Sequence, residues 1–455
     1  MVTAKLVANT QTKKISLALL LAVIAFFVMS MAFTKEQSLL VAAITLMVSL
    51  WSNNGLPMAV VSLLPVIIFP AGGILSTKDA AINYANPIIF LFLGGFLIAI
   101  AVEKTGLHKW IALKILHRFS DSARGIIFSL LITSGLLSSV LSNTTTALLL
   151  LPIALFLTDD NAIKIRFALA IAYGASIGGI LTPIGTPPNL ILFGVMQELG
   201  LEPVAFVQWI WMTAPLVLVM FVFVAYILGL GINNIRIETE LNINQLNGQQ
   251  KKVLFVISSL IVLLLLNAPV RPYYNGLGLN EAGILLSAGL FLFVPPVSIL
   301  NWEEDKNKIQ YQIIFLFGAG FAIAAAFMQT GMAKEIASYL VSFVNVPVIV
   351  FLFIVAALVT FTTEVTSNTA LISVMLPVIY EVANRAGLNV TLFMMVATIC
   401  ASYAFMLPIA TPPNAVVMST GVVNVKTMMS FGFVFNITGI VLIVLIAKFF
   451  WFYLL

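Results

Sequence analysis

Long apolar stretches, separated by short polar segments, run along the whole chain. A helix needs about 20 mainly apolar residues to cross a bilayer, and eleven stretches approach this length or are continued by apolar flanks. The first one follows three lysines but is longer than the apolar part of a signal peptide, so we interpret it as a span. The predicted spans are 15–33, 38–51, 56–68, 87–102, 167–194, 207–230, 253–266, 282–297, 313–328, 392–418 and 431–454.

Two further stretches, 126–157 and 346–380, are too long for one ordinary span and carry polar residues at their centres. We predict that each is a re-entrant hairpin, which enters and leaves the membrane on the same side. Two of the spans, 167–194 and 392–418, are interrupted by proline-containing segments. Irregular backbone at membrane depth is tolerated only where it faces protein or a water-filled cavity. Two hairpin tips and two broken helices therefore predict a cavity.

Composition supports the membrane interpretation and excludes several other classes. The chain has 455 residues, of which 61% are hydrophobic and only 9% are charged, whereas soluble domains carry about 25% charged residues. The net charge of +5 is explained by cytoplasmic loops rather than by nucleic acid. The single cysteine, Cys400, forms no internal disulfide and no zinc site. The two histidines, His108 and His117, fall in one basic loop, where we expect them to be solvated, so an enzyme is not expected.

The basic residues give an orientation. With the amino terminus inside and both hairpins re-entrant, most of the 22 Lys and Arg fall in cytoplasmic loops, as the positive-inside rule requires. We therefore expect an inner-membrane protein with a cytoplasmic N-terminus and an external C-terminus. The basic residues assigned to the outside are Lys35, Lys78, Arg271, Lys334, Arg385 and Lys448.

An internal repeat relates the two halves by a constant shift of 225 positions. Between 88 and 106, 12 of 19 residues are identical to those at 313–331. The same shift carries Ser142-Asn143-Thr144 onto Ser367-Asn368-Thr369, and Thr186-Pro187-Pro188-Asn189 onto Thr411-Pro412-Pro413-Asn414. In the predicted topology the two copies run in opposite directions, and inverted repeats with broken helices are typical of secondary transporters.

The chemistry expected at the tips suits an anion and a cation together. Helix N-termini at the breaks offer N–H groups to an anion, whereas unwound carbonyls offer oxygens to Na⁺. Asn143 and Asn368 can serve both, because an amide carries an acceptor and two donors. Glu364 lies within a hairpin, but its repeat counterpart is Ser139, so we assign it a structural or gating role.

The paired motifs resemble those of the divalent anion/sodium symporter family, over essentially the whole chain and most closely its bacterial sodium-coupled C4-dicarboxylate transporters. The resemblance implies a homodimer in the lipid bilayer, with scaffold and elevator-type transport domains and with succinate, malate or fumarate as substrates. It places the scaffold at 1–85 and 253–310, the repeats at 86–230 and 311–455, and a cytoplasmic loop at 231–252.

The resemblance also implies the site residues. Substrate carboxylates would be held by side chains of both tips and both breaks, and Na⁺ by two repeat-related sites. The substrate residues are Ser142, Asn143, Thr144, Ser367, Asn368, Thr369, Thr186, Pro187, Thr411 and Pro412. The residues of Na⁺ site 1 are Ser138, Ser142, Asn143 and Gly185, and those of Na⁺ site 2 are Thr363, Thr366, Asn368 and Ala410.

Three alternatives remain open at this level. A Na⁺-independent dicarboxylate exchanger and a sulfate or tricarboxylate transporter would use the same fold. An ion channel would need a continuous lined path and flux far above carrier turnover.

Overall fold

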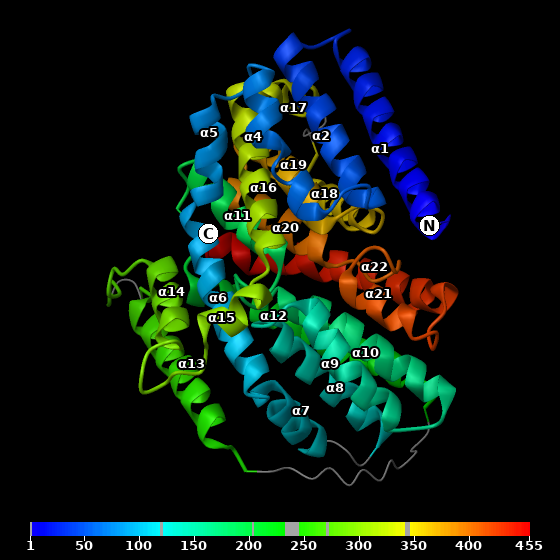
Figure 1. Ribbon diagram of the computed structural model, residues 1–455, viewed down its shortest axis with the longest axis vertical. Coiled ribbons are helices and arrows are strands. Elements are labelled where there is room, and N and C mark those ends of the chain that lie inside the picture. Colours follow the sequence, from blue (N-terminus) through cyan, green and yellow to red (C-terminus); the bar gives the residue numbers. More distant parts are fainter. Residues whose placement is uncertain (1, 119–121, 203, 233–244, 270–272, 342–345) are drawn as a thin grey trace.

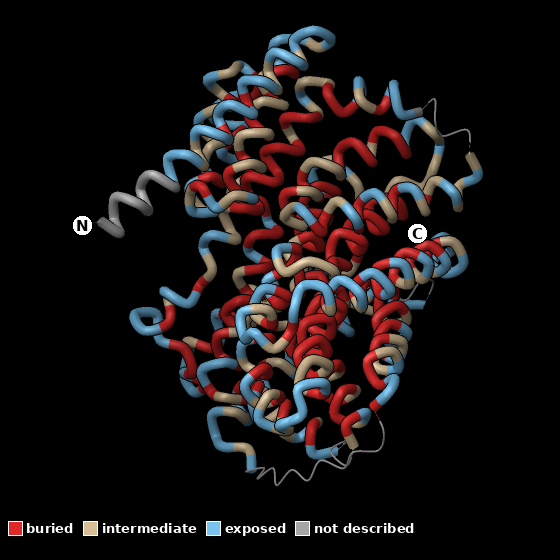
Figure 2. The backbone as a smooth tube through the Cα atoms, turned by 90° about the vertical axis from the view of Figure 1, so that its right-hand side faces the viewer, coloured by how far each residue is buried: buried red, intermediate tan, exposed pale blue. Residues whose placement is uncertain are grey.

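The computed structural model describes residues 2–118, 122–202, 204–232, 245–269, 273–341 and 346–455, and for residues 2–10 and 341 only the backbone. Its described part is all helical, which confirms the predicted fold class. Seven of its helices are long and apolar enough to cross a membrane. Buried residues concentrate along the middle of the molecule, whereas the outer helix faces are exposed (Figure 2). Apolar side chains on those faces, such as Phe27, Phe255 and Trp211, suit a lipid environment.

The described residues of the first half form twelve α-helices. The predicted span 56–68 is interrupted at Ser62–Leu63, so that it forms two short helices. The elements are α1 (Val2–Met29), α2 (Lys35–Asn53), α3 (Met58–Val61), α4 (Leu64–Ala71), α5 (Thr77–Ile82), η1 (Asn83–Ala85), α6 (Pro87–Lys104), α7 (Leu107–Arg118), α8 (Ala123–Ser138), α9 (Asn143–Phe156), α10 (Asn161–Gly179), α11 (Pro187–Glu198) and α12 (Phe206–Gly229).

The second half repeats the order of the central helices. The elements are α13 (Gly248–Asn267), α14 (Glu281–Phe291), α15 (Trp302–Asp305), η2 (Lys306–Lys308), α16 (Tyr311–Gln329), α17 (Met332–Val341), α18 (Val348–Thr363), α19 (Asn368–Arg385), α20 (Val390–Ser402), α21 (Pro412–Ser419), α22 (Val425–Phe449) and η3 (Trp451–Tyr453).

Both overlong stretches form two helices joined by a short break. In the first, α8 ends at Ser138 and α9 begins at Asn143. In the second, α18 ends at Thr363 and α19 begins at Asn368. The two spans with internal prolines are likewise broken, into α10 and α11 and into α20 and α21. The four breaks fall where the polar motifs predicted them.

The short helix that follows the first helix of each repeat was not predicted. After α6 and α16 the chain turns at Gly106 and Gly331, whose φ angles of 69° and 68° favour glycine, and continues as α7 and α17. His108 lies on α7 and is only 2% exposed, so the expectation that it is solvated was wrong. Its Nδ1 lies 3.0 Å from the Val102 carbonyl oxygen, and burial lowers the pKa of His108 despite that contact.

Equivalent hydrogen bonds from glutamine side chains hold the two turns. The Gln250 side chain donates to the Thr105 carbonyl at 3.1 Å, and the Gln37 side chain donates to the Thr330 carbonyl at 3.1 Å. Both glutamines occupy the third position of a helix that begins with a capping box. The inverted symmetry therefore extends beyond the repeated segments to the helices that surround them.

The halves are interlocked at the centre. Figure 1 shows α7–α10 and α12 in its lower half and α16–α20 in its upper half. Yet α9 and α10 of the first half pack against α21 of the second, and α19 of the second half packs against α11 of the first. The N-terminal helices share a separate core with α16, α17 and α19, and α13 and α14 pack on α6. This exchange brings all four breaks to one place.

Candidate functional site

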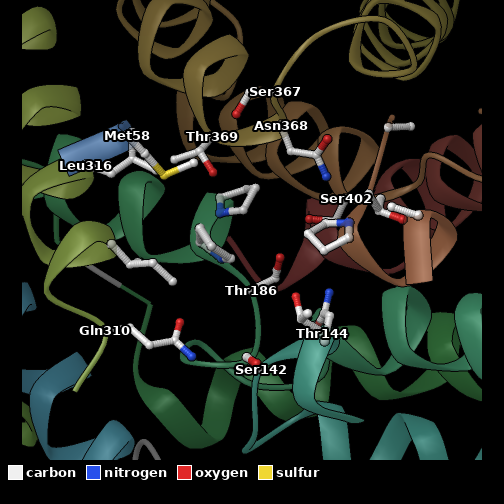
Figure 3. A pocket seen from close by; sticks show the side chains of 18 of the residues that line it. Met58, Ser142, Thr144, Thr186, Gln310, Leu316, Ser367, Asn368, Thr369 and Ser402 are labelled. Carbon is white, nitrogen blue, oxygen red and sulfur yellow. The ribbon is translucent and has the colours of Figure 1, made fainter. Parts of the chain in front are cut away.

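A cavity of about 690 Å³ lies between the four breaks and a wall of flanking helices. All ten residues predicted to hold substrate line it: Ser142, Asn143, Thr144, Thr186, Pro187, Ser367, Asn368, Thr369, Thr411 and Pro412. In Figure 3 the labelled residues of the two S-N-T motifs lie on opposite sides of the cavity, with Thr186 between them. No charged side chain is among the described residues that line it.

Four helices begin at this cavity. Ser142 and Ser367 cap α9 and α19, and their hydroxyls accept from the backbone N–H groups of Thr145 and Ala370. Thr186 and Thr411 precede α11 and α21, each of which opens with two prolines. N-terminal helix ends carry partial positive charge, and those of α9 and α19 also offer N–H groups, whereas proline leaves the first two residues of α11 and α21 without one. Four such ends can therefore attract an anion in the absence of a lysine or arginine.

The residues predicted for the first cation site lie close together. Ser138 is fully buried, and its hydroxyl donates to the Asn143 amide oxygen at 2.5 Å. A Cβ atom on Gly179 would lie 3.0 Å from the Asn143 amide oxygen and 3.3 Å from the Gly185 carbonyl oxygen. The Ser142 hydroxyl is partly occupied, because it also caps α9. Hydroxyl, amide and backbone oxygens thus surround one small space, and oxygens are what hard cations prefer.

The second predicted site has a similar arrangement with different details. The Thr363 hydroxyl lies 2.7 Å from the Asn368 amide oxygen and 3.0 Å from the Ala401 carbonyl oxygen. The Thr366 hydroxyl donates to the Thr362 carbonyl at 2.8 Å, so this side chain already has a hydrogen-bond partner. Ala410 is buried and lines the cavity. Ser138 and Thr363 themselves lie behind the cavity wall.

Sequence reasoning missed the opposite wall of the cavity. It is formed by residues of α2, α3, α6 and α16 and by the segments before them, including Trp51, Asn54, Met58, Phe92 and Gln310. None of these residues belongs to an S-N-T or T-P-P-N motif, so only the tertiary structure brings them to the site. Gln310 and Met58 are seen on this side in Figure 3.

Glu364 holds the second break together. Its carboxylate accepts the N–H groups of Phe405, Met406 and Leu407 at 2.8–2.9 Å, and the Asn436 side chain donates to it at 2.6 Å. The residue is 3% exposed and does not line the cavity. These contacts agree with the predicted structural role.

The matching family model and two relatives of this chain are all transporters of organic acids by name. The model of the family CitMHS, described as citrate transporter, matches residues 41–392. The sodium-dependent dicarboxylate transporter SdcS of Staphylococcus saprophyticus is 32% identical, over 91% of this chain and 86% of its own. The protein of the same name from Staphylococcus aureus strain USA300 is 31% identical, over 92% and 88%.

Two solved structures share the fold. The YdaH transporter of Alcanivorax borkumensis superposes with a TM-score of 0.62 at 16% identity, covering 92% of this chain and 99% of its own. MtrF of Neisseria gonorrhoeae superposes with a TM-score of 0.61 at 14% identity, covering 92% and 95%. At these identities the likeness concerns the arrangement of helices only.

Proposed function

We propose that this protein carries C4-dicarboxylates across the membrane together with Na⁺. The premise is that the chain belongs to the CitMHS citrate-transporter family, within the divalent anion/sodium symporters. The observation that carries the proposal is one cavity, with no charged side chain among its described lining residues, that residues of both S-N-T motifs and of both T-P-P motifs line. The names of the SdcS relatives point to the same substrate class and ion.

The absence of charge among the described lining residues supports coupling. A dicarboxylate in this cavity would meet four helix N-termini, each of which stabilises an anion by only about 0.3–2 kcal/mol and so compensates only part of the cost of burying two charges. Na⁺ bound beside Asn143 and beside Asn368 would supply the remainder, because both amides lie at a candidate cation site and at the cavity. Each ligand then raises the affinity for the other, which is the thermodynamic basis of symport.

The interlocked arrangement of hairpins and broken helices supports a mechanism of alternating access. We propose that the hairpins and the broken helices move as one transport domain against a scaffold that includes 1–85 and 253–310, in an elevator-type motion within a homodimer. The apolar exposed faces of α1 and α13 suit the lipid or a second copy. The N-terminus would lie in the cytoplasm and the C-terminus outside.

Succinate uptake by purified protein in liposomes tests the proposal. We expect uptake that follows an inward Na⁺ gradient and collapses when choline or K⁺ replaces Na⁺. Uptake that ignores Na⁺ but requires internal dicarboxylate would reject symport in favour of exchange. Uptake of sulfate or citrate in preference to succinate would reject the proposed substrate class.

A further inference from the structure

Asn189 occupies the last position of the first T-P-P-N motif, yet it does not line the cavity. Its side chain is fully buried on α11. The amide nitrogen donates to the Thr182 carbonyl at 2.9 Å and lies 3.5 Å from the Gly179 carbonyl oxygen. Gly179 is the last residue of α10, so Asn189 reaches across the break and binds carbonyls that no N–H of a continuous helix pairs with.

Asn414 repeats this arrangement in the second half. It is also fully buried, and its amide nitrogen donates to the Ala404 carbonyl at 3.1 Å and to the Leu407 carbonyl at 3.0 Å. Ala404 and Leu407 are the positions that the 225-residue shift assigns to Gly179 and Thr182. Both copies of the repeat therefore form the same contact.

The carbonyl that each asparagine holds begins a tight turn. The Thr182 carbonyl also accepts the N–H of Gly185 at 3.3 Å, and the Leu407 carbonyl accepts the N–H of Ala410 at 3.2 Å. Gly185 and Ala410 are the residues whose carbonyls are proposed for the two cation sites. The asparagine thus fixes the first residue of a turn whose last residue presents the candidate ligand.

The amide oxygens of Asn189 and Asn414 indicate that the N–H₂ groups, rather than the oxygens, bind the turn. Neither the Asn189 nor the Asn414 oxygen has a hydrogen-bond partner within the described part of the chain. A buried polar atom without a partner costs free energy, so packing alone does not account for an asparagine here. The two N–H donors are the groups that the turn uses, and an amide is the short side chain that offers both to two carbonyls.

We infer that Asn189 and Asn414 are positioning residues for Na⁺, each of which orients the turn that delivers a backbone oxygen to one cation site. The inference rests on the proposed symport. Neither residue touches the substrate cavity, so their loss acts on the ion rather than on the dicarboxylate.

The test is the Na⁺ dependence of succinate uptake by Asn189→Ala and Asn414→Ala in liposomes. We expect the Na⁺ concentration for half-maximal uptake to rise about tenfold in each variant, as the loss of one to two hydrogen bonds implies. The succinate KM at saturating Na⁺ should stay near the wild-type value. Asn→Leu at the same positions, which keeps the branched shape without donors, should reproduce the shift.

Asn267→Ala is the matched control, because Asn267 is also buried and bonds the backbone of Leu279 through both ends of its amide, but on the flanking helix α13. It should leave the Na⁺ requirement unchanged. If a variant is too inactive to assay, Na⁺-dependent thermal stabilisation in detergent gives the same comparison.

The outcomes separate the two proposals. Wild-type protein without Na⁺-dependent uptake would reject symport itself. Na⁺-dependent wild-type protein whose asparagine variants keep the wild-type Na⁺ requirement would overturn the positioning role. An equal loss of Na⁺ and succinate affinity would also overturn it, since that pattern indicates general damage to the site.

Discussion

The Ser138 hydroxyl donates to the amide oxygen of Asn143 at 2.5 Å across the break between α8 and α9. The 225-residue shift converts this pair into Thr363 and Asn368, whose side chains lie 2.7 Å apart across the break between α18 and α19. Each hydroxyl orients an amide that faces both the cavity and a candidate cation site. The predictions that concern transport depend on this repeated geometry.

The two asparagines are expected to be indispensable for transport. Asn143→Ala or Asn368→Ala removes an amide that has a proposed role toward both Na⁺ and a carboxylate, so succinate uptake should be lost. Because both residues are only half-buried at a helix start, the variants should still elute as wild-type protein on size exclusion. Wild-type uptake by both variants would contradict the site assignment.

Removing the hydroxyls behind the asparagines should have a smaller effect. In Ser138→Ala and Thr363→Val the amide oxygen loses its donor, and we expect the Na⁺ requirement for uptake to rise about tenfold, the equivalent of one hydrogen bond. Ser138→Thr and Thr363→Ser keep a hydroxyl and should retain most of the wild-type affinity. Equal defects in the alanine or valine variants and in these conservative ones would indicate a packing effect instead.

Gly185 is expected to tolerate no side chain. A Cβ atom there would lie 2.4 Å from the Gly179 carbonyl oxygen, so Gly185→Ala must open the turn that presents its own carbonyl. We expect loss of Na⁺-dependent uptake. Gly248→Ala serves as the control, because a Cβ atom at Gly248 meets no atom within 4 Å, and it should transport normally.

Glu364 is expected to matter for stability. Glu364→Gln would turn an amide N–H₂ toward backbone N–H groups that now share a carboxylate, leaving at least one buried donor unpaired. That costs about 1–3 kcal/mol, so the melting temperature in detergent should fall measurably. Glu335→Gln, at an exposed position on α17, should leave it unchanged. A wild-type melting temperature for Glu364→Gln would argue against the clamp.

Asp305, which lies outside the predicted spans, is expected to make the stability of the folded protein depend on pH. The carboxylate is 2% exposed and accepts from Lys104 at 2.7 Å and Lys308 at 2.9 Å. Burial by itself would raise the pKa of Asp305, but the bonds from Lys104, the Asn301 N–H and Lys308 hold the pKa below its ordinary value. Because the pKa of Asp305 is lower in the folded state, the ionised carboxylate stabilises the protein at pH values above the ordinary pKa. This stabilisation is lost as the pH falls through the pKa of the folded state.

Thermal melts between about pH 3 and pH 7 check this expectation, since an ordinary Asp titrates near pH 3.9. Wild-type protein should lose stability at the acid end. Asp305→Asn should be less stable at pH 7, by about 1–3 kcal/mol for bonds to a charged group, and should show a flatter acid limb. An unchanged acid limb in Asp305→Asn would assign the pH dependence to other carboxylates.

The amino-acid sequence by itself determined the membrane class, the two hairpins, the broken helices and the residues at their tips. Hydrophobic length fixes where a helix can span, and irregular backbone must be compensated wherever it interrupts a span. Because both halves repeat one pattern, Ser142 predicts Ser367 and Thr186 predicts Thr411. The same logic failed for His108, since a basic segment can still form a helix with one buried face.

Only the tertiary structure decided what closes the site. Trp51 and Gln310 reach the cavity through the packing of helices, although neither residue belongs to an S-N-T or T-P-P-N motif. The roles of Asn189 and Asn414 depend on which carbonyls lie within about 3 Å of a side chain, and the spacing of residues along the chain does not contain that distance. Periodicity predicts faces and breaks, whereas hydrogen bonds across a break exist only once the two halves have interlocked.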